Sequence, residues 1–209
     1  MEIWDISRAL NGTFAQWPGD TPFSFHLTSK MSDGAAVNVG AIEMSVHNGT
    51  HADAPFHFEQ QSPTIEKMPL ESYIGRAVVA QIPGGICEID VSHLGAVEHD
   101  LAHAPRLLLK TDRWLNSAAF PKSIPVISPE VAPWLRARGV KLLGVDLPSV
   151  DAINAKDLAN HHALTAAGIT IVESLDLSAI APGLYHFAGL PLKIEGGDGA
   201  PVRAILWRD

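Results

Sequence analysis

The chain is 209 residues long, with 46% hydrophobic and 18% charged residues, a composition typical of a globular protein. Its formal net charge is −8, and it carries only 15 Lys and Arg side chains. This charge argues against nucleic acid and anionic membranes as partners, because neutralising phosphates requires clustered cations. Cys87 is the only cysteine, which excludes an internal disulfide and argues against a thiolate metal cluster.

The first residues, Met1-Glu2-Ile3-Trp4-Asp5, have neither a cationic start nor an apolar run, so we expect no secretory signal. No apolar segment approaches the length of a membrane span. We therefore expect a cytoplasmic protein without a membrane partner. We also expect Cys87 to be a small packed hydrophobic residue.

Alternation of apolar and polar residues predicts several strands. Over residues 41–47, Ile42, Met44 and Val46 fall on one side and His47 on the other, which predicts a half-buried strand ending at His47. Further strands are expected at Arg76–Ile82, Arg106–Thr111, Lys141–Asp146, Ile169–Ser174, Leu184–Leu192 and Val202–Trp207.

Two helices are expected between these strands. Ser128-Pro129-Glu130 has the features of a helix start, and that helix runs to Gly139 and precedes the strand at 141–146. The second helix, Leu158–Ala167, stops at Gly168 before the strand at 169–174. The pattern predicts a mixed α/β fold with strands predominating, in a single domain over residues 1–209.

The stretch from His47 to His57 holds three histidines and one aspartate in eleven residues. Imidazole and carboxylate are common zinc ligands, and catalytic sites keep a coordination position open for water. His47 and His51 have the spacing of a metalloprotease helix, but Asn48-Gly49-Thr50 disfavours a helix and Pro55 favours extended geometry before it. We interpret the stretch as a strand leading into a ligand-bearing loop; the alternative is a histidine-rich surface loop.

A second ligand set is suggested by Glu173, which lies in an otherwise apolar strand. A carboxylate there is seldom fully buried unless it is paired or bound to metal. His161 and His162 stand just before this unit, so either could join Glu173, although a surface His beside an edge-strand Glu is an equally natural interpretation. The glycines of Gly196-Gly197-Asp198-Gly199 fit a turn better than a phosphate cradle, because no helix follows.

The stretch from His47 to His57 resembles the metal-binding signature of the cyclase family of hydrolases. The resemblance extends along nearly the whole chain and includes Trp17-Pro18-Gly19-Asp20-Thr21-Pro22, Gly144-Val145-Asp146-Leu147-Pro148-Ser149 and Pro201-Val202-Arg203-Ala204. The segment Trp17-Pro18-Gly19-Asp20 and the short length favour the arylformamidase branch. Leu147 departs from the family pattern, where a small or hydroxylic residue is expected, and we expect it to alter the pocket without touching the ligands.

The resemblance implies a cyclase-like swivelling β/β/α fold, a homodimer and two divalent metal ions per subunit, commonly zinc, with manganese as an alternative. It assigns one metal to His47, His51 and Asp53, and a second to His161 and Glu173, with Asp53 bridging the two. The spacing found in the family selects His161 rather than His162. It further assigns His57 as general acid/base and Trp17 as a contact to the aromatic part of the substrate.

The activity that the resemblance implies is hydrolysis of the formamide bond of N-formyl-L-kynurenine to L-kynurenine and formate, a step of tryptophan degradation. Two alternatives remain at this point. One is a related amide hydrolase, such as one that acts on isatin. The other is a non-catalytic metal-binding protein whose cluster has no open position.

Overall fold

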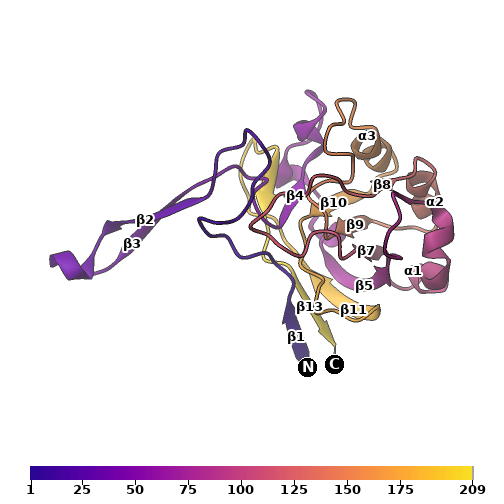
Figure 1. Cartoon of the computed structure of the whole chain (residues 1–209), viewed down its shortest axis with the longest axis horizontal. Coiled ribbons are helices and arrows are strands. Elements are labelled where there is room, and N and C mark those ends of the chain that lie inside the picture. The colour runs from indigo at the N-terminus through magenta and orange to yellow at the C-terminus, as the bar shows by residue number, and fades with distance from the viewer. Residues whose placement is uncertain (209) are drawn as a thin grey trace.

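A curled nine-stranded mixed sheet forms the centre of the molecule (Figure 1). The computed structural model describes residues 1–208. The strands follow the order β1-β13-β11-β5-β7-β9-β10-β4-β12 across the sheet. The four strands β5, β7, β9 and β10 are parallel neighbours, and antiparallel strands extend the sheet on both sides. β1 and β13 pair with each other, so the two ends of the chain lie side by side.

The strands of this sheet are β1 (Glu2–Asp5), β4 (His51–Asp53), β5 (Ile74–Gln81), β7 (Arg106–Lys110), β9 (Leu142–Val145), β10 (Thr170–Glu173), β11 (Gly183–Ala188), β12 (Gly199–Pro201) and β13 (Ile205–Arg208). Two small sheets are formed by β2 (Ser24–Ser29) with β3 (Val39–Glu43), and by β6 (Glu88–Ile89) with β8 (Val126–Ile127). The α-helices are α1 (Glu98–Leu101), α2 (Val131–Ala137) and α3 (Ala159–Ala166). Short 3₁₀ helices span Met31–Asp33, Pro55–His57, Ile65–Lys67, Leu70–Ser72 and Val91–Val97.

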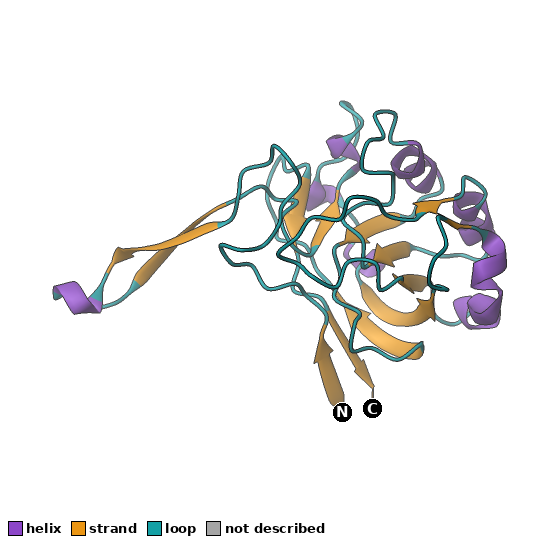
Figure 2. Ribbon diagram, viewed as in Figure 1, coloured by secondary structure: helices purple, strands orange, loops and turns teal. Residues whose placement is uncertain are grey.

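The central strands are apolar along their length because both of their faces are buried. On β7, Leu107 and Leu109 face a cluster that includes Leu135 of α2 and Leu164 of α3. Leu108 faces the opposite cluster, which includes Phe187 of β11. The three α-helices lie together over one side of the sheet (Figure 2). None of the helices within residues 1–208 is long and apolar enough to cross a membrane.

The predicted mixed α/β fold with strands predominating is confirmed. The helices expected at 128–139 and 158–167 correspond to α2 and α3, and Gly168 ends α3 with a φ of 74°. The expected strands match β5, β7, β9, β10, β11 and β13 with shifted ends. The short strands β1 and β12 were not predicted, because three or four residues carry too little periodicity.

The prediction of a half-buried strand over residues 41–47 is correct only for the strand at residues 41–43, and it is wrong for residues 44–47 and for the burial. The strand β3 ends at Glu43, and His47 lies in a turn that follows. β3 pairs only with β2, so it has no core to cover, and Ile42 is 64% exposed. The interpretation of residues 48–57 as a ligand-bearing loop is also wrong in part, because His51–Asp53 forms the buried strand β4.

β2, β3 and the turn between them form a two-stranded arm that projects from the body (Figure 1). The arm exposes a set of large apolar side chains, Phe25, Met31, Val37, Val39 and Ile42. A third expectation that fails concerns Cys87, which is exposed rather than packed. It lies just before β6, a two-residue strand at the periphery.

Candidate active site

The sheet register places the first potential ligands side by side. His51 and Asp53 are two residues apart on β4, so their side chains lie on one face of the sheet. Glu173 at the end of β10 is directly opposite His51 in the antiparallel pair. His51 Nε2 is 3.6 Å from Glu173 Oε2 and 3.4 Å from Asp53 Oδ1. All three side chains are buried.

His161 enters this cluster from the first turn of α3. Its Nε2 lies 3.5 Å from Asp53 Oδ2 and 3.5 Å from Glu173 Oε1. His162, one residue later, points to Glu59 instead, and its side chain is 43% exposed. Of the two histidines, His161 faces the buried carboxylates Asp53 and Glu173, whereas His162 faces the exposed Glu59.

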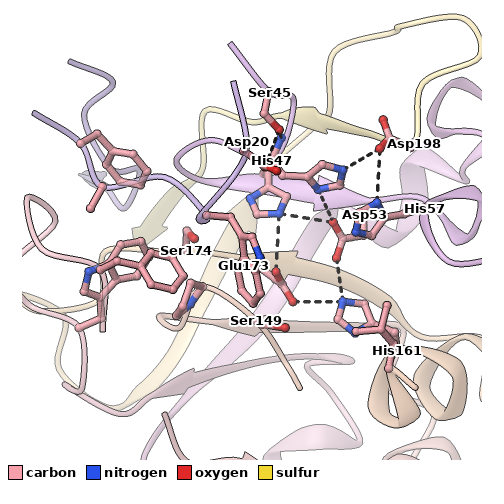
Figure 3. Close-up of a pocket in the computed structure, with 18 residues that line it drawn as sticks. Asp20, Ser45, His47, Asp53, His57, Ser149, His161, Glu173, Ser174 and Asp198 are labelled. Carbon is pink, nitrogen blue, oxygen red and sulfur yellow. Dashed lines mark hydrogen bonds and ion pairs between the residues drawn. The ribbon is translucent and has the colours of Figure 1, made fainter. Parts of the chain in front are cut away.

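Asp53 is central to the cluster (Figure 3). Its Oδ1 lies 3.1 Å from Nδ1 of His47, which reaches in from the turn before β4. Its Oδ2 faces His161 but accepts no hydrogen bond from any of residues 1–208. A buried carboxylate oxygen without a donor costs free energy unless a cation approaches it.

The imidazoles that face Asp53 are fixed from behind. His51 Nδ1 donates to the Gly49 carbonyl at 2.9 Å, and His161 Nδ1 donates to Asp151 Oδ2 at 2.7 Å. These contacts leave Nε2 of both rings directed at the carboxylates. Metal-ligating histidines are generally held in this way by a carbonyl or carboxylate.

Asp198 contacts the rings of two histidines, His47 and His57. Its Oδ2 lies 3.0 Å from Nε2 of His47 and 3.3 Å from Nδ1 of His57. Asp198 lies just before β12, in the Gly196–Gly199 segment, where the predicted turn is present at residues 195–196. His57 ends a short 3₁₀ helix that begins at Pro55, and its side chain is 35% exposed.

The carboxylates shift the titration of these histidines. Burial lowers the pKa of His47, but hydrogen bonds to Asp198 and Asp53 outweigh it and raise the pKa to about 10. For His161, contacts with the surrounding carboxylates likewise outweigh burial and raise the pKa to about 12. Burial and the charge of His47 instead lower the pKa of His57. The carboxylates thus favour the protonated rings of His47 and His161, and a metal that binds these histidines displaces protons.

The donor set fits divalent cations. Ligand atoms of His47, His51 and Asp53 lie within 4.8 Å of one another, as do those of Asp53, His161 and Glu173. Asp53 is common to both groups, and its Oδ2, which accepts no hydrogen bond from residues 1–208, is the kind of atom that a metal ion would satisfy. The nitrogen and oxygen donors suit zinc and manganese. Ligand atoms of His47, His57 and Asp198 also lie within 4.8 Å of one another.

The cluster opens into a cavity of about 310 Å³, which leaves access for water and a small molecule. One part of its wall is aromatic and comprises Phe14, Trp17, Trp114 and Phe120. Trp17 and Phe120 meet edge to face, with ring centroids 5.4 Å apart. Leu147 does not line this cavity, because its side chain is fully buried in the core.

All the candidate residues from the sequence meet at this one cavity: Trp17, His47, His51, Asp53, His57, His161 and Glu173. Sequence reasoning missed Asp198, Asp151 and the other aromatic residues. The only available signal for Asp198 was its place in a glycine-rich turn. Asp151 follows the Gly144–Ser149 segment, but nothing in the sequence indicates that it would reach across to α3.

The cluster of histidines and carboxylates opens into a cavity. Metal-dependent hydrolases use sites of this class. The cyclase family model matches residues 4–152. The chain is 44% identical to a kynurenine formamidase of Geobacillus thermodenitrificans over 99% of this chain and 98% of that protein. It is 40% identical to a kynurenine formamidase of Bacillus thuringiensis over 97% of this chain and 95% of that protein. The chain therefore belongs to the cyclase family.

Solved structures share the fold. Isatin hydrolase A from Labrenzia aggregata superposes with a TM-score of 0.84 at 22% identity, over 98% of this chain and 93% of that one. A structure described as a potential metal-dependent hydrolase with cyclase activity gives a TM-score of 0.78 at 24% identity, over 98% and 96% of the two chains. The cyclase-like fold expected from the sequence is confirmed.

Proposed function

We propose that this chain is a kynurenine formamidase that hydrolyses N-formyl-L-kynurenine to L-kynurenine and formate. The observation that carries this proposal is the meeting of the histidine and carboxylate cluster with an aromatic wall in one open cavity. The identity of 40–44% to relatives of that name, over nearly their full length, supports the choice of substrate. The opening of the cluster into the cavity argues against a closed, purely structural metal site.

We infer that two divalent metal ions bind per subunit, with zinc as the first choice. His47, His51 and Asp53 would hold one ion, and Asp53, His161 and Glu173 the other. When bound, such ions activate a water molecule and polarise a carbonyl oxygen. Around them, Gly49 and Asp151 hold His51 and His161 in the orientation that presents Nε2.

The chain's own residues position the substrate and transfer the proton. The wall that contains Trp17 receives the aryl ring, which leaves the small formyl group directed at the cluster. Water adds to the formyl carbon and the bond from that carbon to the aryl nitrogen breaks, so the departing nitrogen requires a proton. His57 supplies it, because its lowered pKa leaves the ring neutral and able to accept a proton from the attacking water first.

Asp198 orients His57 for this transfer. Its contact to Nδ1 leaves Nε2 as the nitrogen that exchanges the proton. Because the same carboxylate oxygen also contacts His47, it links the acid/base residue to the ligand cluster.

The proposed activity is tested by formate release from N-formyl-L-kynurenine. Zinc-loaded protein should release formate and kynurenine in equal amounts, and chelator-treated protein should do so only after metal is restored. His99→Ala on α1 is the matched control, since this exposed histidine lies outside the cavity. Failure of metal-loaded protein to release formate would overturn the proposal.

We further propose that the chain forms a homodimer through the arm. A two-stranded ribbon has no core of its own and is marginally stable in water. The arm nevertheless exposes Phe25 at 57% and Ile42 at 64%, side by side in the register. A second copy that covers this apolar strip would stabilise it.

The oligomeric state can be measured by light scattering coupled to size exclusion. The native chain should elute as a dimer, and Phe25→Ser combined with Ile42→Ser should shift it to monomer. A monomeric native chain at micromolar concentration would contradict the proposal.

A further inference from the structure

Asp20, the last residue of the segment Trp17-Pro18-Gly19-Asp20, has no part in the proposed mechanism. The Asp20 N–H donates to the Trp17 carbonyl at 3.1 Å, which closes a tight turn. Gly19 has a φ of 99°, a conformation that favours glycine, and Pro18 before it suits the first central position of a type II turn. The turn brings the side chains of Trp17 and Asp20 to the same cavity.

The Asp20 carboxylate lies close to the ligand cluster without taking part in it. Its Oδ2 accepts a hydrogen bond of 2.9 Å from Ser45 Oγ, and the two side chains lie beside His47, away from His161 (Figure 3). Ser45 is in turn tied to this region, since its Oγ accepts from the His47 N–H at 3.3 Å. The contact orients one carboxylate oxygen and leaves Oδ1 available.

Asp20 differs from every other carboxylate that lines the cavity. Asp53 and Glu173 face His51 and His161, and Asp198 faces His47 and His57. Asp20 lies beside His47, but within residues 1–208 no His, Lys or Arg side chain forms an ion pair with it. Among the described residues, it is therefore the one lining carboxylate that forms no ion pair.

The lining of the cavity also contains no Lys or Arg among the described residues. Away from the cluster, the side-chain donors of this lining are neutral hydroxyl and ring N–H groups. An ammonium group, by contrast, would find a half-buried carboxylate that a serine has already oriented. Hydrogen bonds between charged partners are stronger than neutral ones, so this difference affects selectivity.

We propose that Asp20 is a specificity-determining residue that binds the ammonium group of the substrate's side chain. This inference rests on the proposed function and deepens it. The preferred substrate class is an aryl formamide whose side chain carries an ammonium group, and the α-carboxylate of N-formyl-L-kynurenine contributes little to recognition. The aryl ring on the aromatic wall and the ammonium group on Asp20 together fix the position of the formyl group.

The test compares four substrates that share the aryl formamide and differ in which charged groups their side chain carries. N-formyl-L-kynurenine carries both charges, and N-formylkynurenamine keeps only the ammonium group. Removal of the amino group from formylkynurenine leaves only the carboxylate, and ortho-formamidopropiophenone has neither charge. We expect the two ammonium substrates to have similar kcat/KM values, each exceeding that of the neutral substrate by about ten- to a hundred-fold.

One substitution of Asp20 should weaken this ranking, and a second should reverse it. Asp20→Asn should reduce the ratio between the ammonium and neutral substrates to about threefold or less. Asp20→Arg should favour the substrate that carries only a carboxylate over the one that carries only an ammonium group. Asp100→Asn on α1, outside the cavity, is the matched control and should keep the native ranking.

Two outcomes would overturn the inference. One is a native preference for the carboxylate-only substrate. The other is an equal loss for all four substrates in Asp20→Asn, which would make Asp20 a purely structural residue. Binding of kynurenamine and of ortho-aminopropiophenone, followed by tryptophan fluorescence, provides a readout without turnover. If no aryl formamide is hydrolysed, the proposed function fails, and the affinity difference between these two amines then decides the role of Asp20 alone.

Discussion

The floor and the mouth of the cavity are built differently. The floor consists of His51, Asp53, His161 and Glu173, whose side chains are at most 5% exposed. They lie on paired strands and a helix. Gly49 and Asp151 hold His51 and His161 from behind, and the Val150 N–H donates to Glu173. The mouth consists of Trp17, Asp20, His57 and Asp198, which lie in turns, a short 3₁₀ helix and loops, and His57 and Asp198 are 35% and 41% exposed. This difference suggests that the floor retains metal while the mouth selects substrate and transfers protons.

The largest effect should come from the floor. Asp53→Ala removes the residue shared by both ligand groups, so both metals should be lost and turnover should disappear. Glu173→Ala should mainly empty one site, because the other group does not include it. Elemental analysis of the two purified variants, with circular dichroism to confirm folding, measures this. Equal loss of both metals in the two variants would contradict the bridging role of Asp53.

His57→Ala tests whether His57 transfers protons at the mouth or binds metal as part of the floor. Both metals should remain, while kcat should fall by about a hundred- to ten-thousand-fold, the usual contribution of a proton-transfer residue. His99→Ala is again the control. Loss of metal in His57→Ala would assign this histidine to the group that it forms with His47 and Asp198, and would move it to the floor.

A smaller effect is expected for Asp198→Asn. The carbonyl oxygen of asparagine can take the position of Oδ2 but carries no negative charge, so its hydrogen bonds to the two histidines are weaker and kcat should fall by about ten- to a hundred-fold. The metal content should fall less than in Glu173→Ala, because Asp198 contacts His47 from behind. A metal loss as large as that in Glu173→Ala would make Asp198 a direct ligand.

The smallest effect is expected at Trp17. Trp17→Ala should raise KM more than it lowers kcat, because a stacking contact far from the reacting carbon is felt about equally in the ground and transition states. Trp17→Phe should keep most of the native KM, since a ring remains. Steady-state kinetics on N-formyl-L-kynurenine gives both values, and a fall in kcat alone would place Trp17 closer to the chemistry.

Sequence reasoning predicted the floor better than the mouth for a physical reason. His51 and Asp53 are close in sequence, and Glu173 interrupts an apolar strand, so each leaves a local signal. The pairing of His161 with Glu173 could not be derived from the residues alone and depended on family resemblance. The glycine-rich turn around Asp198 did not indicate its contacts to His47 and His57, because these span 151 and 141 residues.

The same distinction explains the errors in the fold. The alternation over residues 41–47 is real, but period alone does not say whether a strand joins the core. Here, Val39–Glu43 pairs only with Ser24–Ser29 and forms the arm. β12 is three residues long and gains its place by pairing with β4, which no local pattern indicates.

The most direct test of this account is the specificity of the native, zinc-loaded chain in a panel of N-formyl-L-kynurenine, isatin, formylanthranilate and simple anilides. The tail and the small formyl group distinguish the first compound, whereas isatin offers a fused ring without a tail. We predict the highest kcat/KM for N-formyl-L-kynurenine. A kcat/KM for isatin that is higher by about tenfold, equivalent to 1.4 kcal/mol in transition-state binding, would contradict the formamidase assignment and leave a metal-dependent hydrolase with a different substrate.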